Sequence, residues 1–353
     1  MFKKMNKNTK SNFITYGMVI IAFIIMQTLI ATGSISSLLE GIMVPVCIYV
    51  IMAVSLNLVV GILGELSLGH AGFMCVGAFS SAFFSKCMRD VIENGFLRFL
   101  LAMLIGIAVA AIFGIIIGIP VLRLKGDYLA IVTLAFGEII KNLVNVLFIG
   151  KDSNGFHFST KDVMGLNMEP DGTVIVNGPQ GITGTPQDST FLIAFIMILI
   201  TLFIVLNMIN SRDGRAIMAI RDNRIAAESV GINITKYKLM AFTVSAALAG
   251  GAGVLYAHNL STLTANTNNF GYNQSIMILV FVVLGGIGNI RGSIIAAVIL
   301  TLLPELLRGL EDYRMLIYAI VLIAMMLFNW APKAIEWREK HLSFHRKKKE
   351  AVK

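Results

Sequence analysis

Residues 56–80 read LNLVVGILGELSLGHAGFMCVGAFS, an apolar stretch with features that an ordinary membrane helix lacks. Five glycines interrupt it, and Glu65, Ser67 and His70 occupy positions where lipid-facing side chains should be apolar. Glycine in a membrane helix either allows close helix packing or marks a break, and a break frees backbone polar groups that protein or water must satisfy. We interpret the stretch as a broken span that lines a path through a bilayer. The alternatives are a loop between two spans, or polar side chains that only bond neighbouring carbonyls near the interface.

The composition of the whole chain is that of a helical membrane protein. The 353 residues are 56% hydrophobic and only 14% charged, and the mean hydropathy is +0.80. So little charge cannot cover the surface of a soluble protein of this size. The apolar runs are continuous and about 20 residues long, which suits helices that cross ~30 Å of hydrocarbon and argues against a β-barrel. We therefore expect an all-α polytopic membrane protein.

The hydropathy pattern predicts about ten transmembrane helices. Their expected ranges are 14–32, 41–60, 65–85, 98–120, 128–149, 190–209, 239–258, 274–287, 294–307 and 313–330. The basic N-terminus 1–13 and the basic tail 332–353 place both termini in the cytoplasm, which requires an even number of spans. We expect a single permease domain over 14–331, with an external loop at 150–189 and a cytoplasmic coupling loop at 211–238. The first span is interpreted as uncleaved, against the alternative of a signal peptide.

The sequence lacks the motifs of several classes of enzyme and binding protein. It contains no Walker A sequence and no motif of a hydrolase or a metalloprotease. Its three cysteines, Cys47, Cys75 and Cys87, form no CxxC pair, which argues against a metal site or a disulfide framework. The net charge of +9 lies at the ends and in one interior loop, as expected for membrane topology rather than for nucleic-acid binding.

The external loop is rich in Gly, Asn, Thr and Pro, and carries five acidic residues. We interpret it as a solvated loop, with a short β-hairpin at TVIVNG, residues 173–178, rather than as a separate domain.

A second unusual span contains two charged residues. Glu138 and Lys141 are three residues apart, so they lie on one face of the helix predicted at 128–149. An ionisable group inside a bilayer costs several kcal/mol unless it is paired with an opposite charge or hydrated. The pair is either an ion pair that holds helices together or a polar lining of the path. Together with the first stretch it defines the path candidates, which are Asn57, Glu65, Ser67, His70 and Glu138.

The topology also orients the glycine-rich stretch. It places the end from Glu65 to His70 near the cytoplasm, where the segment would form part of an inner gate. Gly72 and Gly77 would lie deeper, and we expect them to pack closely against the fifth predicted span.

The sequence GRAIMAIRDNRIAAESVGI, residues 214–232, has the pattern of a short amphipathic helix on the cytoplasmic side. Gly231 suits its C-terminal end. It is either an interfacial helix on anionic lipid or a docking helix for a cytoplasmic partner. The residues expected to act in docking are Arg215, Arg221, Asp222, Arg224, Glu228 and Gly231.

Five segments, in this order, resemble the LivM-type permease of branched-chain amino acid ABC importers. They are LNLVVGILGELSLGHAGFMCVGAF from 56, DYLAIVTLAFGEI from 127, GRAIMAIRDNRIAAESVGI from 214, TKYKLMAFTVSAALAGGAGVLYA from 235 and VLGGIGNIRGSIIAAVIL from 283. The resemblance covers roughly residues 40–330. It is specific for the permease family and less so for the solute, because permeases for urea and short amides look alike in these segments.

The resemblance implies partners that composition does not show. Such permeases pair with a second, LivH-like permease, two cytoplasmic ATPase subunits use the ATP, and an extracytoplasmic solute-binding protein delivers cargo. This chain would bind no cofactor. Residues 214–231 would form the loop that contacts an ATPase, although Ala226-Ala227-Glu228 with Gly231 matches the EAA-then-Gly pattern of importers only loosely. The expected location is the cytoplasmic membrane of a prokaryote, with membrane lipid around the chain and no nucleic acid bound.

These inferences predict a permease subunit, not an enzyme, that moves branched-chain or other hydrophobic amino acids by alternating access. The rivals are an ABC permease for urea or short amides and an ion-coupled secondary transporter that protonates Glu65 or Glu138. A membrane enzyme built on His70 and Glu65 is a weaker alternative, because no nucleophile–base–orienter set is visible.

Overall fold

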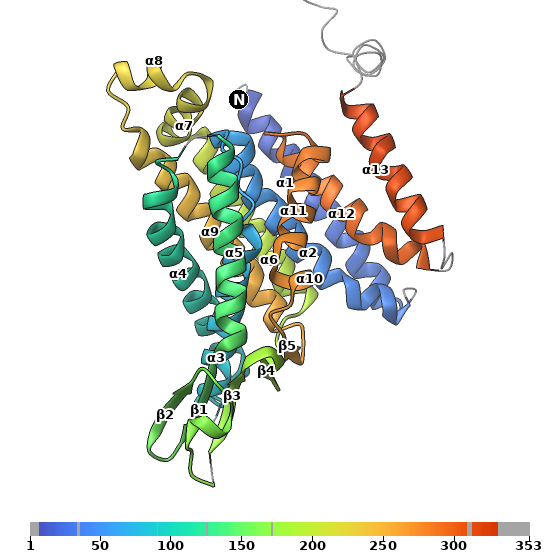
Figure 1. The fold of residues 1–353 in the computed structure, drawn as a ribbon. Coiled ribbons are helices and arrows are strands. Elements are labelled where there is room, and N and C mark those ends of the chain that lie inside the picture. The colour runs from blue at the N-terminus through green and yellow to red at the C-terminus, as the bar shows by residue number, and fades with distance from the viewer. Residues whose placement is uncertain are drawn as a thin grey trace, which may run out of the picture.

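The computed structural model describes residues 7–33, 36–89, 91–124, 126–170, 172–308 and 313–330, which form a bundle of helices with a small β layer at one end (Figure 1). The longer helices are α1 Lys7–Ala31, α2 Ser37–Asn57, α3 His70–Cys87, α4 Gly95–Val121, α5 Asp127–Val146, α6 Phe191–Asn210, α9 Ile234–Ala257, α11 Tyr272–Gly285, α12 Ile290–Leu306 and α13 Arg314–Trp330. The mostly helical class is as predicted, and each of the ten predicted spans overlaps one of these helices.

Not every one of these helices is long and apolar enough to cross a membrane. Within the described residues six candidates are, at Asn12–Ala31, Leu39–Leu63, Gly95–Val121, Tyr128–Val146, Phe191–Asn210 and Ile234–Ala257. Helices α3, α11, α12 and α13 have at most 18 residues. The chain therefore has several candidate membrane spans, and the count of ten stays a prediction.

The two ends of the bundle differ in character (Figure 1). The start of α1 and the end of α13 lie at the same end as the short helices α7, Arg212–Asp222, and α8, Arg224–Ser229. The β layer lies at the opposite end. The basic tail 332–353 and residues 1–6 of the basic N-terminus lie outside the described residues, and the cytoplasmic location of the termini stays a prediction.

Helix α3 is packed between α5 and α9 through glycines. A Cβ on Gly72 would lie 2.7 Å from the Cα of Gly137 on α5, which is the expected close contact with the fifth span. The same expectation is wrong for Gly77, because its Cβ would lie 2.5 Å from the Cα of Gly250 on α9. Five residues turn a helix through about 140° beyond one full turn, so these two glycines face different neighbours.

The polar segment after α5 forms a three-stranded antiparallel sheet in the order β2-β1-β3. Its strands are β1 Phe148–Asp152, β2 Gly155–Ser159 and β3 Thr173–Asn177. One 3₁₀ turn, η2 Met164–Leu166, lies between β2 and β3, and another, η3 Gly178–Gln180, follows β3. The hairpin predicted within residues 173–178 is wrong, since those residues supply only β3, which pairs with β1. The actual hairpin joins β1 to β2, and α5 ends at Val146 instead of Ile149 because β1 begins there.

Two further contacts fasten this layer to the bundle. The Lys86 ammonium at the end of α3 donates to the carbonyl of Val174 in β3 at 2.8 Å. Strand β4, Ile182–Thr183, pairs with β5, Thr262–Leu263, which precedes the one-turn helix α10, Thr267–Phe270. The long polar segment is thus held against the helices by backbone pairing as well as by a charged side chain.

The turn between β1 and β2 depends on one carboxylate. Asp152 Oδ1 accepts from the backbone N–H of Asn154 at 2.9 Å and of Gly155 at 3.1 Å. Its Oδ2 lies 2.9 Å from the imidazole of His157 and accepts from the N–H of Glu169. Burial acts to raise the pKa of Asp152, but the hydrogen bonds from Glu169, Asn154 and His157 outweigh it and leave the pKa below its usual range.

Acidification should loosen this turn. Because the folded-state pKa of Asp152 is lowered, its stabilising contribution is present above the unfolded value of about 3.9 and is lost as the pH falls toward the folded pKa. We expect the exchange protection of the Asn154 and Gly155 amides, corrected for intrinsic exchange, to decrease below about pH 4. Asp152→Asn should remove this pH dependence. Identical pH profiles in the wild type and in Asp152→Asn would contradict the assignment.

Candidate translocation and coupling site

The glycine-rich stretch is broken, as predicted, between α2 and α3. Helix α2 widens into a π-helix, η1 Leu58–Leu63, and Gly64 then adopts a left-handed conformation with φ +80°. The N–H of Glu65 donates to the carbonyl of Val59 at 3.2 Å across this wide turn. Residues 65–69 have no regular structure before α3 begins at His70. A π-turn and a break leave backbone groups without helical partners, so those partners must come from elsewhere.

One such partner is an arginine from the loop that was predicted to be cytoplasmic. Arg221 on α7 donates from Nη1 to the carbonyl oxygen of Gly61 in the π-helix at 3.0 Å. Its aliphatic stem lies over Gly64, where an added Cβ would come 2.5 Å from Arg221 Cγ. The same guanidinium binds Asp222 at 2.9 Å. Arg221 therefore connects α7 directly to the break in the membrane segment.

Asn57, at the start of the glycine-rich stretch, connects α2 to the region around the start of α12. Its side chain is fully buried and donates to Ser293 Oγ on α12 at 2.8 Å. Its Oδ1 accepts from the N–H of Gly288 at 2.9 Å. Both ends of the amide are satisfied, so in this structure Asn57 fixes α2 against the turn that precedes α12.

The start of α3 is enclosed by protein hydroxyls. His70 Nε2 lies 2.7 Å from Ser55 Oγ, and both side chains are buried. The N–H of Ala71 donates to Ser275 Oγ at 3.2 Å, and that of Leu68 donates to a threonine hydroxyl of α5 at 3.0 Å. The amides at this helix N-terminus thus bond side chains of other helices. The buried hydroxyl of Ser67 has no hydrogen-bond partner among the described residues.

Glu65 forms an ion pair with Lys238 near the start of α9. The side chains are only 16% and 6% exposed, respectively. Charges this deep need a partner, because desolvation of a lone ion is costly. The unwound segment is therefore attached to α9 as well as to α7.

Glu138 lies at a different place, between α5 and the start of α11. Its carboxylate is 2.5 Å from Lys141 Nζ and also accepts from the N–H of Tyr272 at 2.8 Å. Lys141 in turn donates to Thr267 at 3.2 Å. Of the two interpretations of this pair, the structure has the ion pair, and the carboxylate also stabilises a helix N-terminus.

The predicted amphipathic helix at 214–232 is two helices, α7 and α8. The expectation of one continuous helix is wrong because Asn223 has an extended backbone and its side chain accepts from the N–H of Ala226, which caps α8. Gly231 ends α8 in a left-handed conformation with φ +84°, as predicted. Arg224 and Glu228 are exposed, and Ile225 is 80% exposed. Arg215 on α7 donates to the carbonyl of Asn210 at 3.3 Å.

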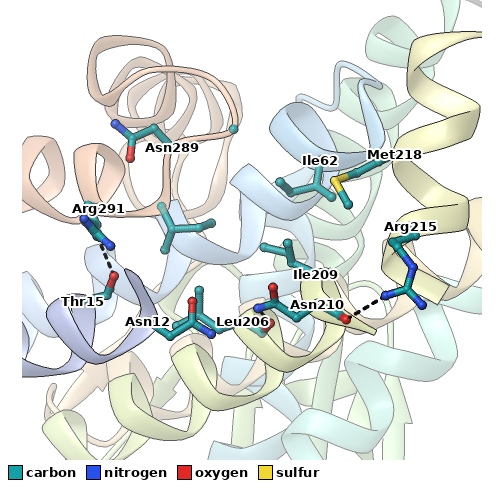
Figure 2. Close-up of a pocket in the computed structure, with 12 residues that line it drawn as sticks. Asn12, Thr15, Ile62, Leu206, Ile209, Asn210, Arg215, Met218, Asn289 and Arg291 are labelled. Carbon is teal, nitrogen blue, oxygen red and sulfur yellow. Dashed lines mark hydrogen bonds between the residues drawn. The ribbon is translucent and has the colours of Figure 1, made fainter. Parts of the chain in front are cut away.

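The structure brings only some of the predicted residues together. Glu65 and Arg221 flank the break, and Asn57 and His70 are buried beside it. The carboxylate of Glu138 instead bonds Lys141 and the start of α11. One cavity among the described residues, with a volume of about 560 Å³, is lined by Arg215 and by none of the five path candidates (Figure 2). Their role in the path stays a prediction.

Sequence reasoning missed the partners that complete the site. Lys238 gave a signal, since it is a charge at the start of an apolar run. The buried hydroxyls of Ser55, Ser275 and Ser293 gave none, because serine is common in membrane helices and only the fold identifies its partner.

Comparison with known proteins gives matches over most of the chain. The family model of the "branched-chain amino acid transport system / permease component" matches residues 38–328. The chain is 35% identical over 297 residues to the high-affinity branched-chain amino acid transport system permease protein LivM of Salmonella typhimurium, covering 82% of this chain and 67% of that protein. Escherichia coli LivM is 35% identical over 298 residues, with the same coverage. Escherichia coli LivH is 25% identical over 288 residues, covering 79% and 88%. No solved structure matches.

Removal of one partner of the Glu65–Lys238 pair should destabilise the fold. Lys238→Met leaves the Glu65 carboxylate enclosed without a counter-charge, at a cost of about 3 kcal/mol. We expect a clear drop in the melting temperature of the detergent-solubilised protein, and partial recovery when the charges are exchanged in Glu65→Lys/Lys238→Glu. Lys236→Met, at an exposed position one half-turn away, is the matched control. Equal melting temperatures for Lys238→Met and Lys236→Met would show that the pair contributes nothing.

Proposed function

This chain belongs to the family of branched-chain amino acid transport system permease components, and we propose that α7 moves its broken α2–α3 segment during transport. It is a permease subunit of an ABC importer for branched-chain amino acids. It is a multi-pass membrane protein, and we assign it to the cytoplasmic membrane of a prokaryote. Two separate ATPase subunits use the ATP, so this chain binds no cofactor. A LivH-like permease is its membrane partner, and an extracytoplasmic binding protein delivers the solute.

One observation carries the mechanism, namely the hydrogen bond from Arg221 to the carbonyl of Gly61. It joins the surface helix α7 to the π-helix at the break. The Glu65–Lys238 pair supplies a second connection, from the unwound segment to α9. A displacement of α7 therefore acts directly on the broken segment, part of whose backbone is bonded by other elements and not by its own helix.

The surface that receives the ATPase is α8 and the exposed side of α7. Ile225 and Val230, on and beside α8, are 80% and 75% exposed and so offer apolar surface to a partner. Arg224 and Glu228 are exposed on the same short helix. Apolar contacts supply affinity there and the flanking charges set the register. ATP binding in the partner then selects one of two arrangements of the bundle.

The structure gives less support to an ion-coupled carrier. Such a carrier needs a carboxylate that gains and loses a proton, and Glu65 or Glu138 was the expected group. Each is in an ion pair with a lysine. Both carboxylates therefore have a partner that accounts for their burial without a transported proton.

Uptake should therefore depend on ATP. In vesicles that contain the assembled transporter and internal ATP, we expect leucine accumulation to survive collapse of the ion gradients by ionophores. Omission of ATP should abolish the accumulation. Uptake that persists without ATP and stops with an ionophore would contradict the ABC mechanism. Competition by excess urea or a short amide tests the alternative solutes, and it should leave leucine uptake unchanged.

Two arginines of the coupling loop should have separable effects. Arg224 is exposed, so Arg224→Glu should reduce the co-purification of the ATPase subunits. Arg221→Met removes the bond to Gly61 but leaves α8 intact, so the ATPase subunits should still co-purify while leucine uptake per ATP hydrolysed falls. Arg123→Glu, an exposed charge reversal after α4, is the control for both. Normal co-purification of Arg224→Glu would refute the docking assignment, and normal coupling in Arg221→Met would refute the mechanism.

A further inference from the structure

Helix α5, which stands at the front of the bundle in Figure 1, exposes polar side chains at the depth of the membrane. Glu138 lies near the middle of the candidate span Tyr128–Val146, and its side chain is 25% exposed. Asn142, one turn further along the helix, is also exposed. The ion pair with Lys141 balances the charge of Glu138 but leaves the carboxylate partly uncovered. Exposed groups of this kind are costly against hydrocarbon, so something other than lipid must cover them.

The first turn of α11 continues this polar surface. The N–H of Tyr272 donates to Glu138 at 2.8 Å, which places the start of α11 beside the carboxylate. Tyr272 is 45% exposed, and the next residue, Asn273, is exposed as well. We call the exposed side chains of Glu138, Asn142, Tyr272 and Asn273 the polar strip. The polar strip thus extends over two helices.

Apolar side chains border the polar strip on both helices. Ile139 and Leu143 on α5 are more than half exposed, and Ile276 on α11 is exposed one turn after the polar residues. A branched-chain amino acid needs both kinds of surface, because its ammonium and carboxylate groups require hydrogen-bond partners and its side chain does not. The amides of Asn142 and Asn273 can donate as well as accept hydrogen bonds. The combined surface therefore suits the solute proposed above.

Helix α4 differs from α5 in its exposed surface, although both are candidate membrane spans. Between Phe96 and Pro120 every exposed residue of α4 is apolar, including Leu104, Ile112 and Ile116. This is the surface that hydrocarbon requires. The contrast indicates that α4 faces lipid and that the polar strip does not.

The polar residues of the break are less suited to line a path. Asn57 and His70 are buried and bonded to other side chains of this chain. The polar strip is instead open on one side, so a path along it needs a second protein wall. The LivH-like partner is related to this chain, so it has a corresponding face, and related subunits commonly pair through equivalent faces.

We propose that the polar strip and its apolar border form one wall of the leucine path, and that the LivH-like permease supplies the opposite wall. The inference rests on the proposed pairing of the two permeases and not on the movement of α7. Arg221→Met should therefore leave the water access of the polar strip unchanged, even where it lowers leucine uptake per ATP hydrolysed.

The test is cysteine accessibility in membrane vesicles that contain the assembled transporter. The native cysteines, which are all buried, are replaced by alanine, and Asn142→Cys or Ile139→Cys is added. A charged, water-soluble thiol reagent modifies the thiolate, which forms only where water is present. We expect both cysteines to react, and leucine transport to slow the reaction severalfold. Ile112→Cys on α4 is the matched control and should react on the order of tenfold more slowly, because lipid surrounds it.

Oxidative cross-linking identifies the opposite wall. Asn142→Cys should form a disulfide with a cysteine in the corresponding helix of the LivH-like permease. A cross-link without reagent access or protection by leucine would show a dry packing interface and overturn the path. Equal reactivity of Asn142→Cys and Ile112→Cys would overturn it too, as would a cross-link to a second copy of this chain. Failure of the two permeases to co-purify would overturn the pairing and this inference together, whereas an unreactive Asn142→Cys in the intact pair overturns this inference alone.

A second pair of variants tests the polar strip without labelling. Asn142→Leu should lower leucine uptake severalfold without lowering the melting temperature, because the position is exposed within this chain. Asn142→Gln keeps the amide and should retain most of the uptake. If Asn142 faced lipid, Asn142→Leu would leave uptake unchanged, and that result would contradict the proposal.

Discussion

The architecture depends on a helix break whose backbone groups cannot be left unpaired inside a membrane protein. A buried polar group without a partner costs about 1–3 kcal/mol, and hydrocarbon offers no water to replace it. Here the carbonyl of Gly61 is bonded by Arg221 and the amide of Leu68 by Thr133. The amide of Ala71 is bonded by a hydroxyl on α11. The break is therefore the point at which α5, α7 and α11 are joined.

This arrangement explains how a segment can be stable and movable at once. Several of its hydrogen bonds come from α5, α7, α9 and α11 in addition to those within its own backbone, so the segment follows those elements when they move.

Side-chain pairs and helix ends can be predicted from the sequence where the residues involved are close in the chain. Glu138 and Lys141 are one helical turn apart, and their ion pair follows from that spacing. The left-handed end of α8 at Gly231 follows from the freedom of glycine at positive φ. Glu65 and Lys238 are 173 positions apart, and no local rule connects them. The same limit explains the error at Gly77, since the sequence shows that a small residue packs closely but not against which helix.

The sequence by itself determined the membrane class, the permease family and the existence of a break between residues 56 and 80. It could do so because hydropathy and backbone freedom are properties of single residues and short windows. Only the tertiary structure decided which groups complete the break, where the β layer pairs, and that the loop at 214–232 forms two helices. Hydrogen-bond and ion-pair partners distant in the chain are chosen by the packing of all helices together.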